Sequence, residues 1–248
     1  MVENRKKMSK FGLVGRNISY SFSKTYFTQK FKTLHLHDCE YSNFDMQTIK
    51  EFTEVIAKGV KGLNITIPYK EQVIRFLDEI DKEALEIGAV NTIKISNNKL
   101  KGFNTDVYGF EESLKPLLQK HHTKALILGT GGASKAVAFV LRKLSIDYLM
   151  ISRNPIKGQI SYQDITKSIL KKYTVIINCT PLGTYPKVTT CPDIPYIDIT
   201  DKHLLYDLIY NPLKSKFLSK GEERGASISN GLKMLELQAE KSWEIWNR

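Results

Sequence analysis

The sequence has few cysteines, no internal repeat, no low-complexity stretch and no long apolar run. Its three cysteines, Cys39, Cys179 and Cys191, are odd in number and widely spaced, and no C-x-x-C motif occurs. This pattern argues against a disulfide framework and against a zinc site, so we expect no metal. No apolar run approaches the roughly 20 residues that a membrane-spanning helix requires, so we expect no membrane partner.

The first ten residues are polar and basic, and no hydrophobic segment follows them. We therefore expect no signal peptide and a cytoplasmic location. The 248 residues, 42% hydrophobic and 25% charged, are typical of a globular chain with one large domain or two modest ones.

The net charge of +11 is a feature that nucleic-acid-binding proteins share. The lysines, however, are spread along the chain, and their small clusters contain no interleaved aromatic residues. We therefore expect no nucleic-acid partner and favour an enzyme whose ligands are anionic, since a positive field would attract them.

Hydrophobic periodicity predicts alternating strands and helices over the first hundred residues. The strands are expected at 11–15 and 62–67, and the helices at 24–37 and 45–57, with Asp45 as N-cap of the second helix. Residues 90–95 and 99–103 flank Ser96-Asn97-Asn98 and predict a hairpin.

A more regular series begins at residue 125 and predicts a parallel sheet built from βαβ units. Its strands are expected at 125–129, 148–152, 174–178 and 204–208, and its helices at 134–144 and 165–172. From Asn230, a candidate N-cap, apolar residues at helical spacing predict an amphipathic terminal helix.

A glycine-rich turn lies between the first predicted strand and helix of this series. It consists of Gly129, Thr130, Gly131, Gly132 and Ala133, and Ser134 replaces the third glycine of the usual fingerprint. Such a turn lets a phosphate approach the backbone at a helix N-terminus, which indicates a dinucleotide site.

The end of the next predicted strand indicates which dinucleotide binds. An NAD enzyme usually carries an acid there, whereas this strand ends in Ser152-Arg153-Asn154, with Lys157 close behind. An arginine pairs with a 2′-phosphate that an acid would repel, so we expect NADP(H).

Short polar side chains collect near several predicted strand ends in the first half of the chain. They are Ser21 and Ser23, Asn64, Thr66 and Lys70, Asn91-Thr92, and Asn104-Thr105-Asp106. Each alone is most often a turn or cap residue, but together they can form a pocket for a polyhydroxylated small molecule.

In these motifs the sequence resembles the shikimate dehydrogenase family over nearly its whole length. The residues that carry the resemblance are Ser21-x-Ser23, Asn64-x-Thr66-x-Pro68-x-Lys70, Gly88-Ala89-Val90-Asn91-Thr92, Asn104-Thr105-Asp106, the turn at 129–133, and segments 178–183, 207–212 and 230–239. Some positions depart from the family pattern, namely Tyr20, Lys24, Lys82, Ser152 and Thr184.

The resemblance implies an α/β fold with an N-terminal substrate-binding domain and a Rossmann-type NADP-binding domain. The expected boundaries are 1–105 with 229–248 for the substrate-binding catalytic domain, to which the terminal helix returns, and 106–228 for the NADP-binding domain. The implied activity is the reversible NADPH-dependent reduction of 3-dehydroshikimate to shikimate in chorismate and aromatic amino acid biosynthesis, by a monomer or homodimer.

The resemblance also assigns residue roles. Lys70 and Asp106 are the implied catalytic pair, with Asp106 expected to orient the lysine. The implied shikimate ligands are Ser21, Ser23, Asn64, Thr66, Lys70, Asn91, Asp106, Tyr210 and Gln238. The implied cofactor ligands are Gly129, Thr130, Gly131, Gly132, Ala133, Ser152, Arg153, Asn154, Lys157, Thr180, Leu208 and Gly231.

Four alternatives stay open at this point. A dual quinate/shikimate dehydrogenase using NAD would need an acid where Ser152-Arg153 stands. A methylenetetrahydrofolate dehydrogenase has a similar layout but fits the Ser-x-Ser and Asn-Thr-Asp motifs poorly. A non-enzymatic NADP-binding sensor would be expected to lack Lys70 or Asp106, and a basic DNA-binding protein would show salt-dependent binding.

Overall fold

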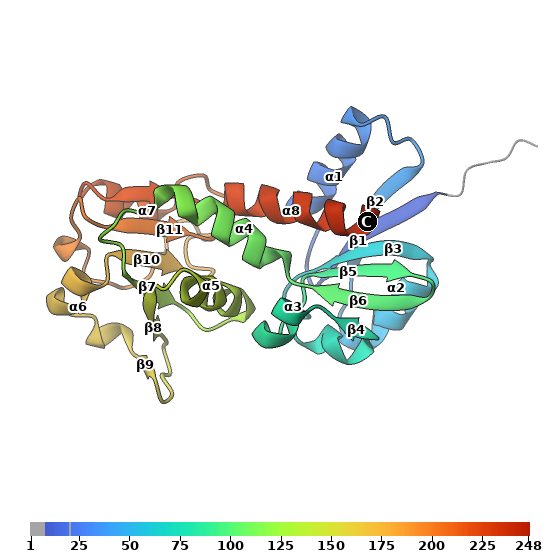
Figure 1. Cartoon of the computed structure of the whole chain (residues 1–248). Helices are drawn as coiled ribbons and strands as arrows, with labels where there is room; N and C mark the ends of the chain where they lie inside the picture. The colour runs from blue at the N-terminus through green and yellow to red at the C-terminus, as the bar shows by residue number, and fades with distance from the viewer. Residues whose placement is uncertain (1–7, 20) are drawn as a thin grey trace, which may run out of the picture. The chain divides into compact units, whose positions relative to one another are not determined.

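The computed structural model describes residues 8–19 and 21–248, and Figure 1 shows its elements in chain order. The chain forms two compact units. The first comprises Met1–Thr105 and Ala239–Arg248, and the second comprises Asp106–Gln238.

The first unit contains a six-stranded mixed sheet with the order β2-β1-β3-β5-β6-β4. β1 pairs in parallel with β2 and β3, whereas β5 runs antiparallel to both β3 and β6. Its strands are β1 (Ser9–Gly15), β2 (Cys39–Asp45), β3 (Val60–Ile65), β4 (Glu79–Ile80), β5 (Thr92–Ser96) and β6 (Lys99–Phe103). Its helices are α1 (Phe22–Thr33), α2 (Phe52–Ala57), α3 (Lys82–Ile87) and the last turns of α8 (Leu232–Asn247), with short 3₁₀ helices at Ile49–Glu51 and Gln72–Phe76.

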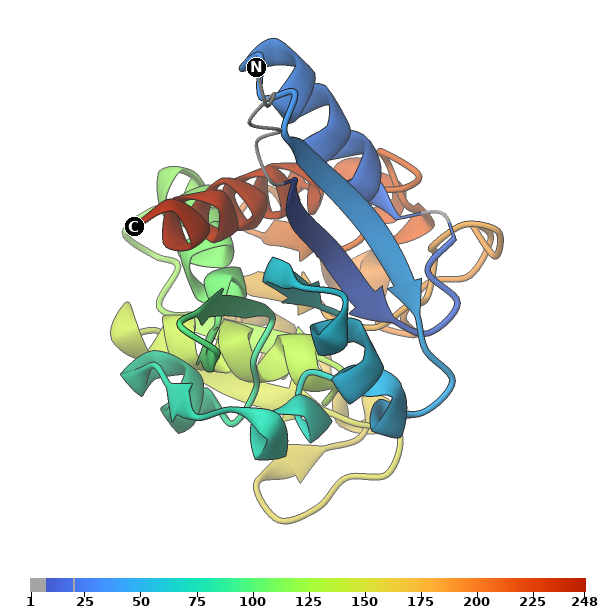
Figure 2. The same ribbon diagram turned by 90° about the vertical axis from the view of Figure 1, so that its right-hand side faces the viewer.

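Apolar side chains pack on both faces of this sheet. Alternate residues of β1 point to opposite faces and contribute to both. Phe11 packs on one side with Phe27 of α1 and Trp246 of α8, and the Phe11 and Trp246 rings stack at 5.0 Å. Val14 packs on the other side with Phe52 of α2. Figure 2 shows α1 and the end of α8 next to β1 and β2.

The second unit contains a six-stranded sheet in the order β12-β11-β10-β7-β8-β9, and every pairing in it is parallel. Its strands are β7 (Lys124–Leu128), β8 (Asp147–Ile151), β9 (Gln159–Ile160), β10 (Val175–Asn178), β11 (Leu204–Asp207) and β12 (Ser227–Ser229). Its helices are α4 (Thr105–Leu114), α5 (Gly132–Lys143), α6 (Lys167–Lys172), α7 (Lys216–Glu222) and the first turns of α8, with 3₁₀ turns at Lys115–Leu117, Tyr162–Asp164 and Tyr196–Asp198.

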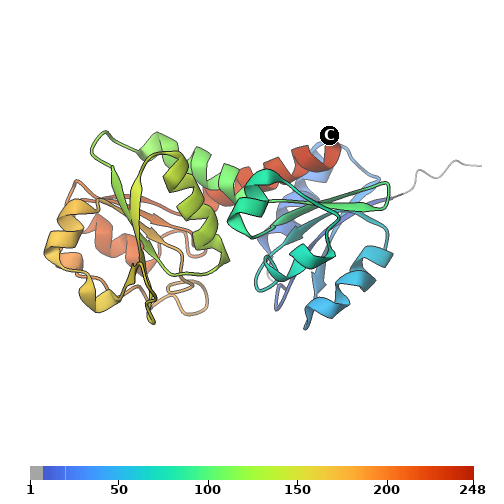
Figure 3. The ribbon, with the colours of Figure 1, turned by 60° about the horizontal axis from the view of Figure 1, so that its bottom comes forward.

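This strand order is that of a Rossmann fold, in which the connections reverse direction between β7 and β10. The strands read as nearly continuous apolar runs, such as residues 125–128, because helices cover both faces of the sheet. Figure 3 shows α5 on one side of the sheet and α6 and α7 on the other. The predicted α/β fold class is confirmed, including the terminal helix that returns to the first unit.

Helix α8 is one continuous helix shared by both units. At its start, Gly109 of α4 lies so close that an added Cβ would be 2.5 Å from the Met234 carbonyl oxygen. At its end, Trp246 packs in the first unit and donates its indole N–H to the Ile93 carbonyl at 3.0 Å. Residues 229–238, which the sequence analysis assigns to the substrate-binding domain, therefore belong by packing to the second unit.

Neither predicted N-cap residue holds that position. Asp45 is the last residue of β2, and the following helical segment begins at Ile49. Thr48 caps it instead, in a capping box in which Glu51 accepts the Thr48 backbone N–H at 2.8 Å. Asn230 lies one residue before the N-cap position of α8, which Gly231 holds, and its side-chain oxygen accepts the Leu232 N–H at 3.1 Å.

Candidate functional site

The second unit has a glycine turn at the carboxyl end of β7, next to the point where the strand order reverses. Gly129 has a φ of +104°, a conformation that glycine adopts readily, and a Cβ there would lie 3.0 Å from Thr180. A Cβ added at Gly131 would meet no atom within 4 Å. The turn thus bends sharply and leaves open space over the start of α5.

The start of α5 is suited to an anion. Its first turn contains no acidic residue, and the first four amides of a helix have no partner within the helix. Ser134 is fully buried and its hydroxyl donates to the Gly131 carbonyl at 2.6 Å, which ties the helix to the turn. A phosphate group fits this end of the helix.

A buried carboxylate organises the loops after β10 and β11. Asp207 accepts hydrogen bonds from the Asn178 amide at 2.9 Å, from the Ile209 N–H at 3.1 Å and from the Ser215 hydroxyl. Asn178 in turn accepts the Thr180 N–H at 3.0 Å and the Thr180 hydroxyl at 2.6 Å. Burial raises the pKa of Asp207 to about 6, although its three donors each lower it.

The loop after β8 carries exposed cationic groups. Arg153 and Lys157 are exposed, and the Ser152 hydroxyl accepts the Asn154 N–H at 3.2 Å. Since no acid ends β8, the electrostatics of this loop favour an added phosphate over a bare ribose.

The remaining predicted cofactor residues of this unit lie in the loops after β11 and before α8. The Leu208 N–H donates to the Asn178 carbonyl at 3.0 Å, and the Gly231 N–H donates to the Ile209 carbonyl at 3.0 Å. A Cβ at Gly231 would collide with the Leu208 carbonyl oxygen, so these two loops are held in direct backbone contact.

The first unit contains a buried network of hydroxyl and amide groups at its strand ends. Asn64 accepts the Tyr41 hydroxyl at 2.8 Å and donates to Ser242 at 2.9 Å. Ser242 also lies 2.8 Å from the Thr92 hydroxyl. Burial raises the pKa of Tyr41 well above its usual range, and a hydrogen bond with Ser23 offsets part of that shift.

The network continues to the last residues of this unit. Asn91 accepts the Thr105 N–H at 2.7 Å and the Thr92 hydroxyl at 3.1 Å, and Asn104 donates to the Ala89 carbonyl at 2.9 Å. Asn64, Asn91 and Thr105 are all buried. These motif residues, far apart in sequence, are therefore brought together.

Some buried side-chain oxygens of this unit have no hydrogen-bond partner. Within residues 8–19 and 21–248, three buried side-chain atoms have no hydrogen-bond partner: Ser21 Oγ, Asn43 Oδ1 and Asn104 Oδ1. Ser21 and Asn104 both belong to the predicted substrate motifs. Because a buried polar atom without a partner is costly, such atoms indicate a ligand or an ordered water.

Lys70 lies in the loop after β3. It is half-buried, and its carbonyl accepts the Val90 N–H at 2.8 Å. Thr66 is also half-buried, and its N–H donates to the Val14 carbonyl at 2.9 Å. The backbone is thus fixed to β1 at Thr66 and to the segment before β5 at Lys70, and both residues follow the carboxyl end of β3.

Comparison with known proteins identifies the family. The model of the shikimate dehydrogenase substrate-binding domain matches residues 13–93. A Clostridium botulinum protein named shikimate dehydrogenase (NADP(+)) is 36% identical over 246 residues, covering 95% of each chain. The chain belongs to the shikimate dehydrogenase family.

Other shikimate dehydrogenases agree with this. One from Methanococcus maripaludis is 36% identical over 99% of this chain and 93% of its own. The crystal structure of the Thermus thermophilus enzyme in complex with NADP(H) and shikimate superposes with a TM-score of 0.86 at 28% identity, covering 96% of this chain and 93% of that one. The predicted family and enzyme class, an NADP-dependent oxidoreductase acting on a CH–OH group, are confirmed.

Within this family member, the predicted shikimate ligands are divided between the units. Asp106, Tyr210 and Gln238 belong to the second unit, and the other predicted ligands belong to the first. Asp106 and Gln238 are buried, and the Gln238 amide donates to the Leu235 carbonyl at 2.9 Å. Tyr20, one of the positions that depart from the family pattern, lies outside the described residues.

Sequence reasoning missed Tyr41 and Ser242, which complete the buried network around Asn64. Tyr41 lies on β2, a strand whose polar sequence conceals it, and Ser242 is one small hydroxyl within an amphipathic helix. No group of three His, Cys, Asp or Glu side chains in the described part of the shikimate dehydrogenase chain could hold a metal ion. Nor is any described helix both long enough and apolar enough to cross a membrane.

Proposed function

We propose that this chain reduces 3-dehydroshikimate reversibly to shikimate with NADPH, in the cytoplasmic synthesis of chorismate and aromatic amino acids. The buried network of the first unit carries the proposal. It gathers Asn64, Asn91 and Thr105, and the buried oxygens Ser21 Oγ and Asn104 Oδ1, which have no protein partner, are left for a polar ligand.

The glycine turn and the start of α5 are proposed to hold the diphosphate of NADP, because the open space over Gly131 admits it. Arg153 and Lys157 are proposed to pair with its 2′-phosphate. Thr180, Leu208 and Gly231 line the loops that would receive the nicotinamide end. When bound, the cofactor supplies the hydride.

Lys70 and Asp106 are proposed as the catalytic pair. As hydride reaches the ring carbonyl, negative charge develops on its oxygen, and the Lys70 ammonium stabilises that charge and donates a proton to the oxygen. In the reverse direction Lys70 accepts the proton from the hydroxyl. Asp106 orients Lys70 and accepts a hydrogen bond from a substrate hydroxyl.

Ser21 and Ser23 are proposed to donate to the substrate carboxylate. Both lie at the start of α1, where Ser21 is the N-cap and the first turn contains no acid. A carboxylate is favoured at that end of a helix by the unpaired backbone amides and the helix dipole. Thr66, Tyr210 and Gln238 are proposed to bind the ring hydroxyls.

The test is a spectrophotometric assay with shikimate and NADP, run in parallel with quinate and with NAD. Lys70→Ala is expected to lower kcat by at least about 100-fold, the usual contribution of a general acid–base group, while NADPH binding is retained. Lys50→Ala, at an exposed lysine of the same unit, is the matched control. Near-normal turnover by Lys70→Ala would refute the proposed role, and faster turnover of quinate with NAD would favour the quinate/shikimate alternative.

A further inference from the structure

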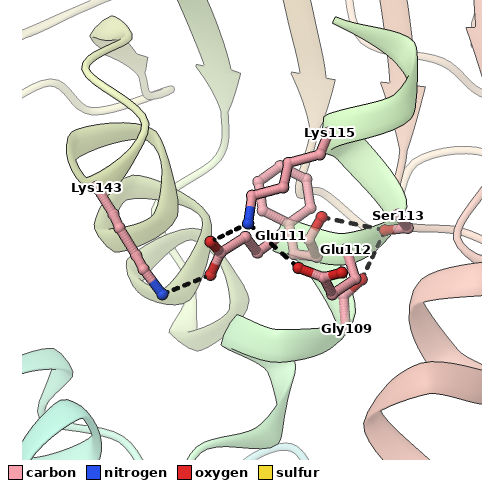
Figure 4. Close-up of polar contacts among 7 residues, drawn as sticks. Gly109, Glu111, Glu112, Ser113, Lys115 and Lys143 are labelled. Atoms are coloured by element: carbon pink, nitrogen blue, oxygen red, sulfur yellow. Dashed lines mark hydrogen bonds and ion pairs between the residues drawn. The ribbon is translucent and has the colours of Figure 1, made fainter.

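Helix α4 contains two carboxylates besides Asp106, and one of them, Glu111, faces α5 rather than solvent (Figure 4). The Glu111 side chain is only 9% exposed, and both its oxygens are engaged. Oε2 accepts a hydrogen bond from the Lys143 ammonium at 2.7 Å, and Oε1 accepts one from the Lys115 ammonium at 2.6 Å. Lys143 is the last residue of α5, so this ion pair joins the two helices.

The surroundings of the Glu111–Lys143 ion pair favour one fixed geometry. Burial raises the pKa of Glu111, but the hydrogen bonds and charges of Lys115 and Lys143 together bring it below its ordinary value. Lys115, four residues on in sequence, fixes the carboxylate from its own side. Lys143 is a cation at the C-terminus of α5, where the helix dipole favours positive charge.

Several contacts hold α4 within the second unit, among them the contact of the Phe110 ring with the Tyr206 ring. Gly109 packs against α8, and Ser113 lies 2.7 Å from the Tyr206 hydroxyl of β11. The ion pair with Lys143 connects α4 with the helix that starts at the glycine turn. The other contacts hold α4 on the sheet and on α8, and the ion pair joins α4 directly to the end of α5.

The geometry of α5 makes its far end sensitive to this contact. Its 12 residues span about 18 Å, so a tilt of about 3° at Lys143 would displace the Gly132 end by about 1 Å. Asp106 lies at the start of α4, in the same helix as Glu111. A misplacement of that size between reacting groups can lower turnover by up to about 100-fold.

We propose that Glu111 is a positioning residue, whose ion pair with Lys143 sets the tilt of α5 and thereby the place of the diphosphate-binding turn relative to Asp106. The inference rests on the proposed function. It predicts that losing the pair impairs catalysis more than cofactor binding, because the diphosphate moves together with the turn that holds it.

The experiment compares Glu111→Gln, Lys143→Gln and the double variant with Glu112→Gln. Glu112 is the matched control, since its side chain is 42% exposed and it contacts Lys115, three residues on in sequence, at 3.2 Å. Glu111→Gln and Lys143→Gln are each expected to lower kcat about 10-fold, with the Kd for NADPH changed less than about two-fold. The double variant is expected to be no slower than either single variant, because both remove the same contact.

The outcomes separate a positioning role from a purely structural one. A lowered melting temperature with kcat equal to that of Glu112→Gln would overturn the proposal, and so would effects of Glu111→Gln and Lys143→Gln that multiply in the double variant. If the wild-type protein does not oxidise shikimate, the proposed function fails and the positioning role fails with it. If the wild type is active and Glu111→Gln matches Glu112→Gln, only the positioning role fails.

Discussion

The buried carboxylate of Asp207 predicts an unusual dependence of stability on pH. Its pKa is about 6 in the folded protein and 3.8 for a free aspartate, because burial outweighs the three hydrogen bonds that it accepts. The folded state therefore binds the proton more tightly than the unfolded state. The stability associated with this group is fully present below about pH 4 and is lost as the pH rises through about 6.

The magnitude follows from the difference between the two pKa values. Each unit corresponds to about 1.4 kcal/mol, so the shift from 3.8 to about 6 amounts to about 3 kcal/mol of unfolding free energy. The replacement Asp207→Asn keeps the shape of the side chain but cannot ionise. Relative to this variant, the wild-type protein should lose most of this, about 2.4 kcal/mol, between pH 4 and pH 7.

Urea unfolding of both proteins at a series of pH values measures this difference. Comparing them at each pH cancels the contribution of other groups, such as His122 and His203, whose pKa values burial lowers. Asp147→Asn, at an exposed carboxylate, is the control and should change the difference by less than about 1 kcal/mol. A difference for Asp207→Asn that stays flat, or that changes in the opposite direction, would show that the three donors offset the burial.

Two further predictions concern cofactor choice and packing. Arg153→Asp should lower the ratio of kcat/KM for NADP to that for NAD by at least about 10-fold, since an ion-paired hydrogen bond is worth about 1.5–3 kcal/mol; an unchanged ratio in steady-state assays would remove Arg153 from the phosphate site. Gly109→Ala should destabilise the protein by about 1–3 kcal/mol in urea unfolding, because the new Cβ would lie 2.5 Å from the Met234 carbonyl; unchanged stability would mean that α4 and α8 separate at no cost.

Elements with strong apolar patterns were predictable from the sequence. β7 is almost entirely apolar, and the turn after it contains the glycine that its conformation requires. The sequence therefore predicted both the strand and its position. β2 was missed because its sequence is largely polar, with Tyr41 as its one buried residue. The two-residue and three-residue edge strands β9 and β12 are too short to produce a periodic signal.

The candidate site was predictable to the extent that its residues form local motifs. Asn64 and Asn91 stand out near strand ends, and the structure joins them through Thr92. Ser242 lies 178 residues from Asn64 in sequence, and nothing local distinguishes it from a solvated helix residue. Pairings of this kind depend on the tertiary path of α8, which hydrophobic spacing predicts as a helix without saying what it packs against.

The sharing of α8 between the two units has a consequence for synthesis on the ribosome. The stretch from Asp106 to Gln238 is continuous in sequence, so the second unit is built from one uninterrupted segment of chain. The N-terminal sheet emerges earlier but must wait for Trp246, which stacks on Phe11 almost at the end of the chain. The part made first is therefore completed only after the whole second unit has been synthesised.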